Sequence, residues 1–147
     1  MPLKLQTGIS NTSETFSVGQ KQLVCLARAV LRHNRILVLD EATSNVDMRT
    51  DDFIQKTLKE RFRDYTIITI AHRLNTIADY DLVIVMDKGT AVEIGSPLQL
   101  MTNSPTDSSI TKLGVFAEMV RSTGDNAANI FRLAKNKYLG DGSLPKA

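Results

Sequence analysis

The chain has 147 residues, the length of a single domain with a hydrophobic core of its own. Apolar residues make up 42% and charged residues 23%, a balance typical of globular proteins. The net charge of +2 comes without a basic run, which argues against a nucleic-acid binder. The single cysteine, Cys25, excludes an intramolecular disulfide and favours a reducing compartment. We expect neither a membrane span nor a signal peptide, because no apolar run is long enough.

The first elements are predicted from one cap and one apolar run. Residues 1–15 are polar and predict a loop. Ser17 can cap a helix that ends near Arg32. The apolar residues of this helix that we expect on one face are Leu23, Leu26, Ala27, Val30 and Leu31. The unbroken apolar run 36–39 then predicts a strand that is buried on both faces, as in a parallel sheet.

A second strand should lie parallel to the first. Residues 47–50 predict the start of another helix, with Ile54, Leu58 and Phe62 as its inner stripe. The run 66–70 predicts the next strand, and His72 follows its end. A strand, a helix and a strand in this order make a βαβ unit, so the two strands should be parallel.

The rest of the chain predicts a hairpin followed by short helices. We expect a short helix at 74–79 and two strands, 82–87 and 90–94, around the Lys88-Gly89 turn. A helical turn at 97–102 and a loop to residue 109 precede two longer helices. These helices span about 110–122, with Leu113, Phe116, Met119 and Val120, and about 126–138, with Ile130, Leu133 and Ala134; the end of the chain is expected to fray.

Two adjacent carboxylates, Asp40 and Glu41, follow the first strand. Ligands of open α/β sheets bind beyond the carboxyl ends of the strands, where these side chains stand. Successive side chains of an extended chain point in opposite directions, so the two carboxylates cannot share one task. One can hold a metal ion while the other faces water, which is the division of labour that phosphoryl transfer needs.

Four short motifs in a fixed order carry a resemblance to a known family. They are residues 16–22 (FSVGQKQ), 36–41 (ILVLDE), 44–47 (SNVD) and 71–73 (AHR). This series resembles the C-terminal half of the nucleotide-binding domain of ATP-binding cassette (ABC) transporters, over about residues 12–122. The four segments resemble the signature motif, the Walker B strand, the D-loop and the switch histidine, in that order. The implied fold is α/β: a partial P-loop NTPase-like sheet with flanking helices, lacking the Walker A strand and loop.

The resemblance implies a role for each matching residue. Asp40 would support Mg²⁺, Glu41 would act as general base on the attacking water, and His72 would hydrogen-bond the γ-phosphate. The signature residues Ser17, Val18, Gly19 and Gln20 would contact the γ-phosphate of ATP held by a partner nucleotide-binding domain. Independently of the family, a helix that starts there offers unpaired N–H groups to an anion, and glycine allows a close approach. Ser44 and Asp47 would communicate across the dimer.

The signature departs from the usual Leu-Ser-Gly-Gly-Gln at two positions. Phe16 stands in place of Leu, and Val18 stands in place of Gly. A branched side chain at Val18 would crowd the approach of a phosphate. The resemblance is closest to the second nucleotide-binding domain of the C subfamily, the multidrug-resistance-associated exporters, where an altered signature accompanies the catalytic glutamate. The ATP site made with this signature would be the weaker of two.

The phosphate-binding loop G-x-x-x-x-G-K-[ST] is not in the sequence, because none of the eight glycines is followed by lysine. The strand that bears this loop in the family lies beside the strand that ends near His72. We therefore expect the apolar edge at 66–70 to be exposed, and the chain alone to be unstable or to pair through that edge. We also expect no ATP turnover by the chain alone, since the phosphate cradle supplies positioning and electrostatic stabilisation.

The first reading is a fragment of the ATPase domain of a C-subfamily exporter of organic anions or drugs. The ATPase part would span 16–122, preceded by a loop at 1–15 and followed by a helix and tail at 123–147. ATP and Mg²⁺ would act in the complete transporter, with a partner nucleotide-binding domain and transmembrane domains. The complete transporter would place this part on the cytoplasmic face of a membrane, and the fragment itself would be soluble. Two alternatives stay open: a truncated, non-hydrolytic module that docks on a full transporter, and a soluble ABC-type ATPase of DNA maintenance.

Overall fold

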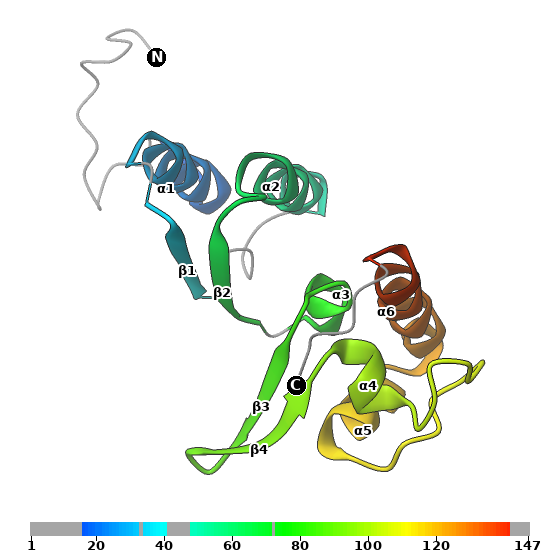
Figure 1. Cartoon of the computed structure of the whole chain (residues 1–147). Helices are drawn as coiled ribbons and strands as arrows, with labels where there is room; N and C mark the ends of the chain where they lie inside the picture. Colours follow the sequence, from blue (N-terminus) through cyan, green and yellow to red (C-terminus); the bar gives the residue numbers. More distant parts are fainter. Residues whose placement is uncertain (1–15, 33, 41–47, 72, 142–147) are drawn as a thin grey trace, which may run out of the picture. The chain divides into compact units, whose positions relative to one another are not determined.

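The computed structural model describes residues 16–32, 34–40, 48–71 and 73–141 (Figure 1). The chain divides into two compact units, Met1–His72 and Arg73–Ala147, and each is described by itself. The predicted loop at 1–15 and the predicted frayed end beyond residue 141 lie outside the described residues.

The first unit is a βαβ unit preceded by one helix. Its elements in chain order are α1 (Val18–Arg32), β1 (Ile36–Asp40), α2 (Met48–Arg61) and β2 (Thr66–Ile70). The strands β1 and β2 are parallel neighbours, with Ile36 opposite Thr66 and Asp40 opposite Ile70. This confirms the predicted strands and their direction. A crossover connection through a helix is what allows two parallel strands to pair in this way.

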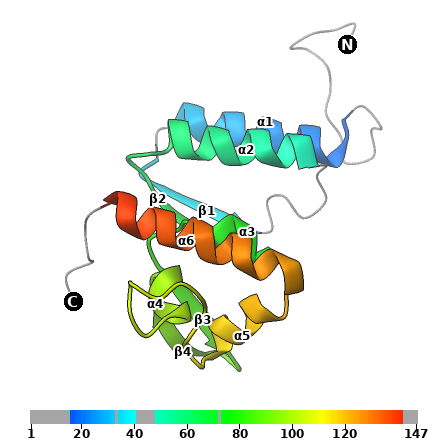
Figure 2. The ribbon, with the colours of Figure 1, turned by 90° about the vertical axis from the view of Figure 1, so that its right-hand side faces the viewer.

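Both helices of the first unit pack on one face of the β1–β2 pair (Figures 1 and 2). The predicted stripe of α2, which is Ile54, Leu58 and Phe62, is buried with at most 4% exposure. Leu37, Leu39 and Ile67 of the strands pack against this stripe. Strand residues alternate between the two faces of a sheet, so every second strand residue points toward the helices.

The other face of the β1–β2 pair is exposed. It carries four large apolar side chains that are between 53% and 61% exposed: Ile36, Val38, Ile68 and Ile70. The prediction that the first strand is buried on both faces was therefore wrong. An unbroken apolar run shows that a strand could be buried on both faces, but burial also needs a second layer, and the described residues of this unit supply only one.

The inner face of α1 also differs from the prediction. Leu23, Leu26 and Val30 pack on the core as expected, but Ala29 completes the face. Ala27 is exposed, and Leu31 is 77% exposed. At 100° per residue, positions 27 and 31 fall on the flank of the stripe formed by residues 23, 26 and 30.

The second unit begins with a short helix and a hairpin. The helix is α3 (Leu74–Ile77), and the strands β3 (Val83–Asp87) and β4 (Thr90–Gly95) are antiparallel, as predicted. Lys88 and Gly89 both have positive φ angles, 46° and 80°. Two such residues match the twist of the flanking strands, which explains the tight connection. The register slips between Val85 and Met86, where a bulge interrupts the ladder.

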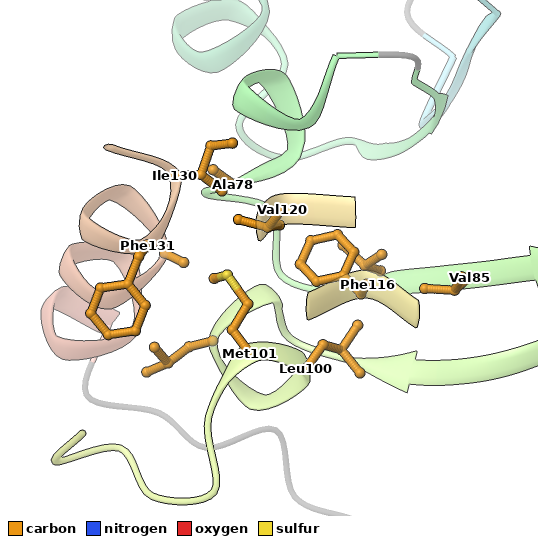
Figure 3. Packing of buried hydrophobic residues seen from close by; sticks show 11 residues of the cluster. Ala78, Val85, Leu100, Met101, Phe116, Val120, Ile130 and Phe131 are labelled. Carbon is orange, nitrogen blue, oxygen red and sulfur yellow. The ribbon is translucent and has the colours of Figure 1, made fainter. Parts of the chain in front are cut away.

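Three helices and a 3₁₀ turn complete the second unit: α4 (Pro97–Met101), α5 (Val115–Arg121), η2 (Gly124–Asn126) and α6 (Ala127–Asp141). Ser96 caps α4 in a reciprocal capping box with Gln99, and Pro97 occupies the first helical position. The core of the unit collects buried side chains from the hairpin and the helices (Figure 3). Phe116, Met101 and Ile130 are among its largest members and are 1% exposed or less.

Helix α5 starts five residues later than the predicted 110, because hydrogen bonds outside any helix hold the preceding segment. The Asp107 carboxylate accepts from the Asn103 and Ser104 amides at 3.2 and 3.1 Å and from the Thr111 hydroxyl at 2.5 Å. Arg121 donates to the Lys112 carbonyl at 2.7 Å. Of the apolar residues predicted for this helix, Phe116 and Val120 are buried.

The remaining two, Leu113 and Met119, are 89% and 45% exposed. Leu113 stands before the start of α5, so helical spacing does not apply to it. The start of α5 is fixed from a distant strand, because the Glu93 carboxylate of β4 accepts from the amides of Val115 and Phe116, each at 2.9 Å. None of the helices among the described residues combines the length and the apolar character needed to cross a bilayer.

Candidate phosphate-sensing site

The first candidate element is the start of α1, where the residues of the predicted signature lie. Ser17 stands just before the helix, as predicted for its cap. Its Oγ accepts from the Gln20 amide at 3.2 Å, and the Gln20 Oε1 accepts from the Ser17 amide at 3.0 Å. These reciprocal bonds are a capping box, which satisfies two donors that a helix start would leave open.

This arrangement gives Gln20 a role that was not predicted. The signal was present, because Ser followed three residues later by Gln is itself the pattern of a capping box. The amides of Val18 and Gly19, the first two of the helix, have no acceptor within the helix by their position. Together with the positive end of the helix dipole, they give this end of α1 the chemistry of an anion site. The Ser17 hydroxyl is exposed and can still donate its own proton.

The second candidate element is the carboxyl end of β1. Asp40 is the last residue of the strand, is exposed, and lies opposite Ile70 in the register. Leu37 and Leu39 face the helices, so the alternation of a strand places Asp40 on the other face. An exposed carboxylate at the carboxyl edge of parallel strands has the chemistry of a ligand for a hydrated cation.

The two elements lie at the same end of the first unit. Helix α1 runs back over the sheet before the chain turns into β1, so the helix start and the end of β1 face the same way (Figure 2). The parallel register adds the end of β2, because Asp40 and Ile70 are level. The chain therefore brings the signature, the acidic strand end and the end of the second strand to one end of this unit.

Four predicted site residues, Glu41, Ser44, Asp47 and His72, lie outside the described residues. Their places in the chain are nevertheless set by their neighbours in sequence: Glu41 follows Asp40 directly, and His72 comes two residues after the end of β2. The Val18 side chain is likewise outside the described part of the structure. Among the described residues, no group of three or more His, Cys, Asp or Glu side chains forms a ready metal cluster.

The sequence matches known proteins over most of its length. A family model described as ABC transporter matches residues 1–44. A Drosophila melanogaster protein described as a probable multidrug resistance-associated protein is 56% identical over 124 residues, which are 84% of this chain and 8% of that protein. Human ATP-binding cassette sub-family C member 4 is 47% identical over 139 residues, or 94% of this chain and 10% of that protein. This chain belongs to the ABC transporter family.

Further comparisons agree with this assignment. A Caenorhabditis elegans protein, multidrug resistance protein mrp-7, is 50% identical over 85% of this chain. Among solved structures, a bacterial Atm1-family ABC exporter with ATP bound matches with a TM-score of 0.69 and 35% identity, over 84% of this chain and 20% of that one. The match confirms the predicted fold class, a part of the ABC ATPase α/β fold. The chain spans about a tenth or less of the length of the curated relatives described above.

Family membership confirms part of the prediction from the motifs. The chain has the sequence of an ABC transporter of the multidrug-resistance-associated type. ATP is the nucleotide that this family binds. The roles of single residues, the metal at Asp40 and the domain boundaries at 16–122 remain predictions.

Proposed function

We propose that this chain supplies the γ-phosphate-sensing half of an ATPase site in an exporter of organic anions or drugs. The observation that carries the proposal is the level register of Asp40 and Ile70, which brings the two strands that lead to Glu41 and His72 to one edge. The similarity to multidrug-resistance-associated relatives supports the transporter class over an ATPase of DNA maintenance.

The proposed roles concern the attacking water and the γ-phosphate of ATP. Glu41 takes a proton from the attacking water, and His72 donates a hydrogen bond to the γ-phosphate, where negative charge develops. The N-terminal amides of α1 and the Ser17 hydroxyl face the γ-phosphate held by a partner domain, and Ser44 and Asp47 report on that contact. This signature is of the type expected for a second nucleotide-binding domain.

The residues present fit Mg²⁺ as well as the phosphate end of ATP. Mg²⁺ keeps several waters and needs one or two carboxylates beside the phosphate oxygens, so the exposed Asp40 carboxylate suffices as the protein's share. When bound, the ion neutralises charge on the phosphates. The phosphate cradle, the transmembrane domains and the partner nucleotide-binding domain would come from the transporter, at the cytoplasmic face of its membrane.

The test compares ATP hydrolysis by the purified chain with hydrolysis by a transporter that contains this stretch. We expect no turnover by the chain alone and at least a 100-fold loss in the transporter on Glu41→Gln, which removes the base and keeps the shape of the side chain. Glu60→Gln is the matched control, because Glu60 is an exposed glutamate of α2 that pairs with Lys56.

Two results would count against the proposal. Turnover by the chain alone that Glu41→Gln abolishes would show that no phosphate cradle from elsewhere is needed. Full activity of the Glu41→Gln transporter would remove Glu41 from the reaction. A chain that binds a transporter without affecting Glu41-dependent hydrolysis, and loses binding on Ser17→Arg, would instead support a docking module.

A further inference from the structure

The sequence contains two Ser-Pro dipeptides, Ser96-Pro97 and Ser104-Pro105, and both lie in the second unit. A serine followed directly by proline is the minimal site that proline-directed protein kinases modify. The proline favours an extended backbone at the serine, which is the form that a substrate groove accepts. Whether a kinase can use either dipeptide therefore depends on what the folded chain does with each of them.

The first dipeptide is built into the core of the unit. Pro97 is the first residue of α4 and is buried, and Ser96 caps the same helix. The Ser96 Oγ accepts from the Gln99 amide at 3.3 Å, and the Gln99 Oε1 accepts from the Ser96 amide at 3.0 Å. Leu98, which follows Pro97, is 1% exposed. To present Ser96 to another protein, the chain would have to unfold the start of α4 and expose apolar side chains.

The second dipeptide lies in a surface loop. Figure 1 shows the segment between α4 and α5 as a loop outside the helices of the second unit. In this loop Pro105 and Thr106 are exposed, and Ser104 is half-buried. The Ser104 carbonyl accepts from the Asp107 amide at 3.0 Å, which closes a turn with proline at its second position. The Ser104 hydroxyl bonds to the Thr106 hydroxyl at 2.7 Å in an exposed contact. Such a turn can open without disturbing the buried core.

A phosphate at Ser104 would bring its charge close to the carboxylate of Asp107. The Asp107 Oδ2 accepts from the amides of Asn103 and Ser104 at 3.2 and 3.1 Å and from the Thr111 hydroxyl, and these bonds hold the loop. A phosphoserine carries about −1.5 to −2 charges at neutral pH, and like charges within one turn repel each other. The Lys135 ammonium group, which donates to the Asp107 carbonyl at 2.6 Å, offsets part of this repulsion.

We propose that Ser104 is a phosphorylation site for a proline-directed protein kinase, and that the phosphate opens the turn that Asp107 holds. In this reaction the kinase transfers the γ-phosphoryl group of ATP to the Ser104 Oγ. The bond from the γ-phosphorus to the β-phosphate oxygen breaks, a bond to Oγ forms, and the hydroxyl proton passes to the catalytic base of the kinase. The proposal does not depend on any role of this chain in ATP hydrolysis by a transporter.

The first test incubates the folded 147-residue chain with a purified mitogen-activated protein kinase, Mg²⁺ and ATP, and locates the phosphate by mass spectrometry. Two synthetic peptides of equal length, 91–101 and 99–109, present Ser96 and Ser104 without the fold. We expect both peptides to be phosphorylated. In the folded chain we expect Ser104 to be modified at least about ten-fold faster than Ser96, because access to Ser96 requires local unfolding.

Two variants check that the kinase recognises the dipeptide. Pro105→Ala should abolish modification at Ser104, whereas Ser108→Ala, which changes an exposed serine of the same loop, should leave it unchanged. Equal rates at the two Ser-Pro serines of the folded chain would overturn the proposed site. An unmodified peptide 99–109, or a modified peptide beside a folded chain that stays unmodified at Ser104, would overturn it as well.

The second test measures hydrogen exchange in the phosphorylated chain. We expect the protection of the Asn103 and Ser104 amides, which bond to the Asp107 carboxylate, to fall about five-fold after phosphorylation. The Leu100 amide, which bonds to the Ser96 carbonyl at the start of α4, is the internal control and should keep its protection. A chain that is phosphorylated at Ser104 and keeps the protection of both loop amides would overturn the opening of the turn.

Discussion

Glu93 joins two distant parts of the second unit through a single carboxylate. It accepts from the first two amides of α5, and its own residue lies on β4. We predict that Glu93→Ala lowers the free energy of unfolding by about 1–2 kcal/mol, because two helix-start donors lose their acceptor. Glu93→Gln, which keeps one acceptor oxygen, should cost less. Urea unfolding measures both, with Glu118→Ala as the control, since Glu118 is 76% exposed.

Gly114 provides a second check on the same contact. A Cβ placed on Gly114 would collide with the Glu93 carboxylate, so Gly114→Ala should destabilise the wild-type chain. In the Glu93→Ala background the collision is gone, and the cost of Gly114→Ala should shrink. Costs that simply add in the double variant would contradict this account.

Asp107 should titrate below the ordinary range of an aspartate. The hydrogen bond from the Thr111 hydroxyl lowers the pKa of Asp107 most, with further help from the Ser104 amide. A pKa that is lower in the folded chain stabilises it above the unfolded value of about 3.9, and this contribution is lost as the pH falls through the folded value. We predict that NMR titration of the carboxyl carbon gives Asp107 a lower pKa than an unfolded aspartate has, and that Thr111→Val raises it. Equal values in both chains would refute the assignment.

At the level of elements, α1 depends on its cap. Ser17→Ala removes the acceptor of the Gln20 amide. We predict a loss of about 1 kcal/mol in the local stability of α1, seen as about five-fold faster exchange of the Lys21 amide, which bonds to the Ser17 carbonyl. Ser122→Ala is the control, because the Ser122 hydroxyl donates to the Met119 carbonyl at the C-terminal end of a different helix, α5. Unchanged exchange at Lys21 would mean that the capping box contributes nothing.

The elements that were predictable are those with local causes. The stripe at Ile54, Leu58 and Phe62 and the turn at Lys88-Gly89 depend on residues close in sequence, and the structure has both. The start of α5 could not be found in this way, because Glu93 stands 22 residues before Val115. Burial of β1 on one face likewise depends on which helices pack on the sheet, and the apolar run in the sequence does not contain that information.

The candidate site was predictable to the extent that it consists of motifs. The cap at Ser17 follows from a local pattern, and the position of Asp40 at the carboxyl end of a parallel strand follows from the βαβ rule. The structure confirms both positions. The capping role of Gln20 was missed because the signature pattern and the capping box share the same letters. Outside this site, the hydrogen bond from Asn126 to Asn75 of the second unit joins residues 51 apart and leaves no periodic trace in the sequence.

At the scale of the whole molecule, exposed apolar faces govern behaviour in solution. The β1–β2 pair exposes Ile36, Val38, Ile68 and Ile70 together, and exposed apolar patches of this kind drive association. We predict that the purified chain self-associates at micromolar concentration, and that Val38→Lys with Ile68→Lys reduces this. Sedimentation velocity measures the change. Lys56→Glu with Glu60→Lys, a charge swap on the exposed side of α2, is the control. A monodisperse wild-type monomer with a sharp thermal transition would contradict the prediction.

The different connections of the two strand pairs set an order of folding. The hairpin closes through the two-residue turn at Lys88-Gly89, whereas β1 and β2 meet only after the crossover through α2. Closing the longer loop costs more entropy and slows folding, so we predict by pulse-labelling exchange that residues 83–95 gain protection before 36–40 and 66–70. Simultaneous protection of both pairs would contradict this. A ribosome delivers the slower half first, and that half emerges with its apolar strand face open while the faster half is still being made.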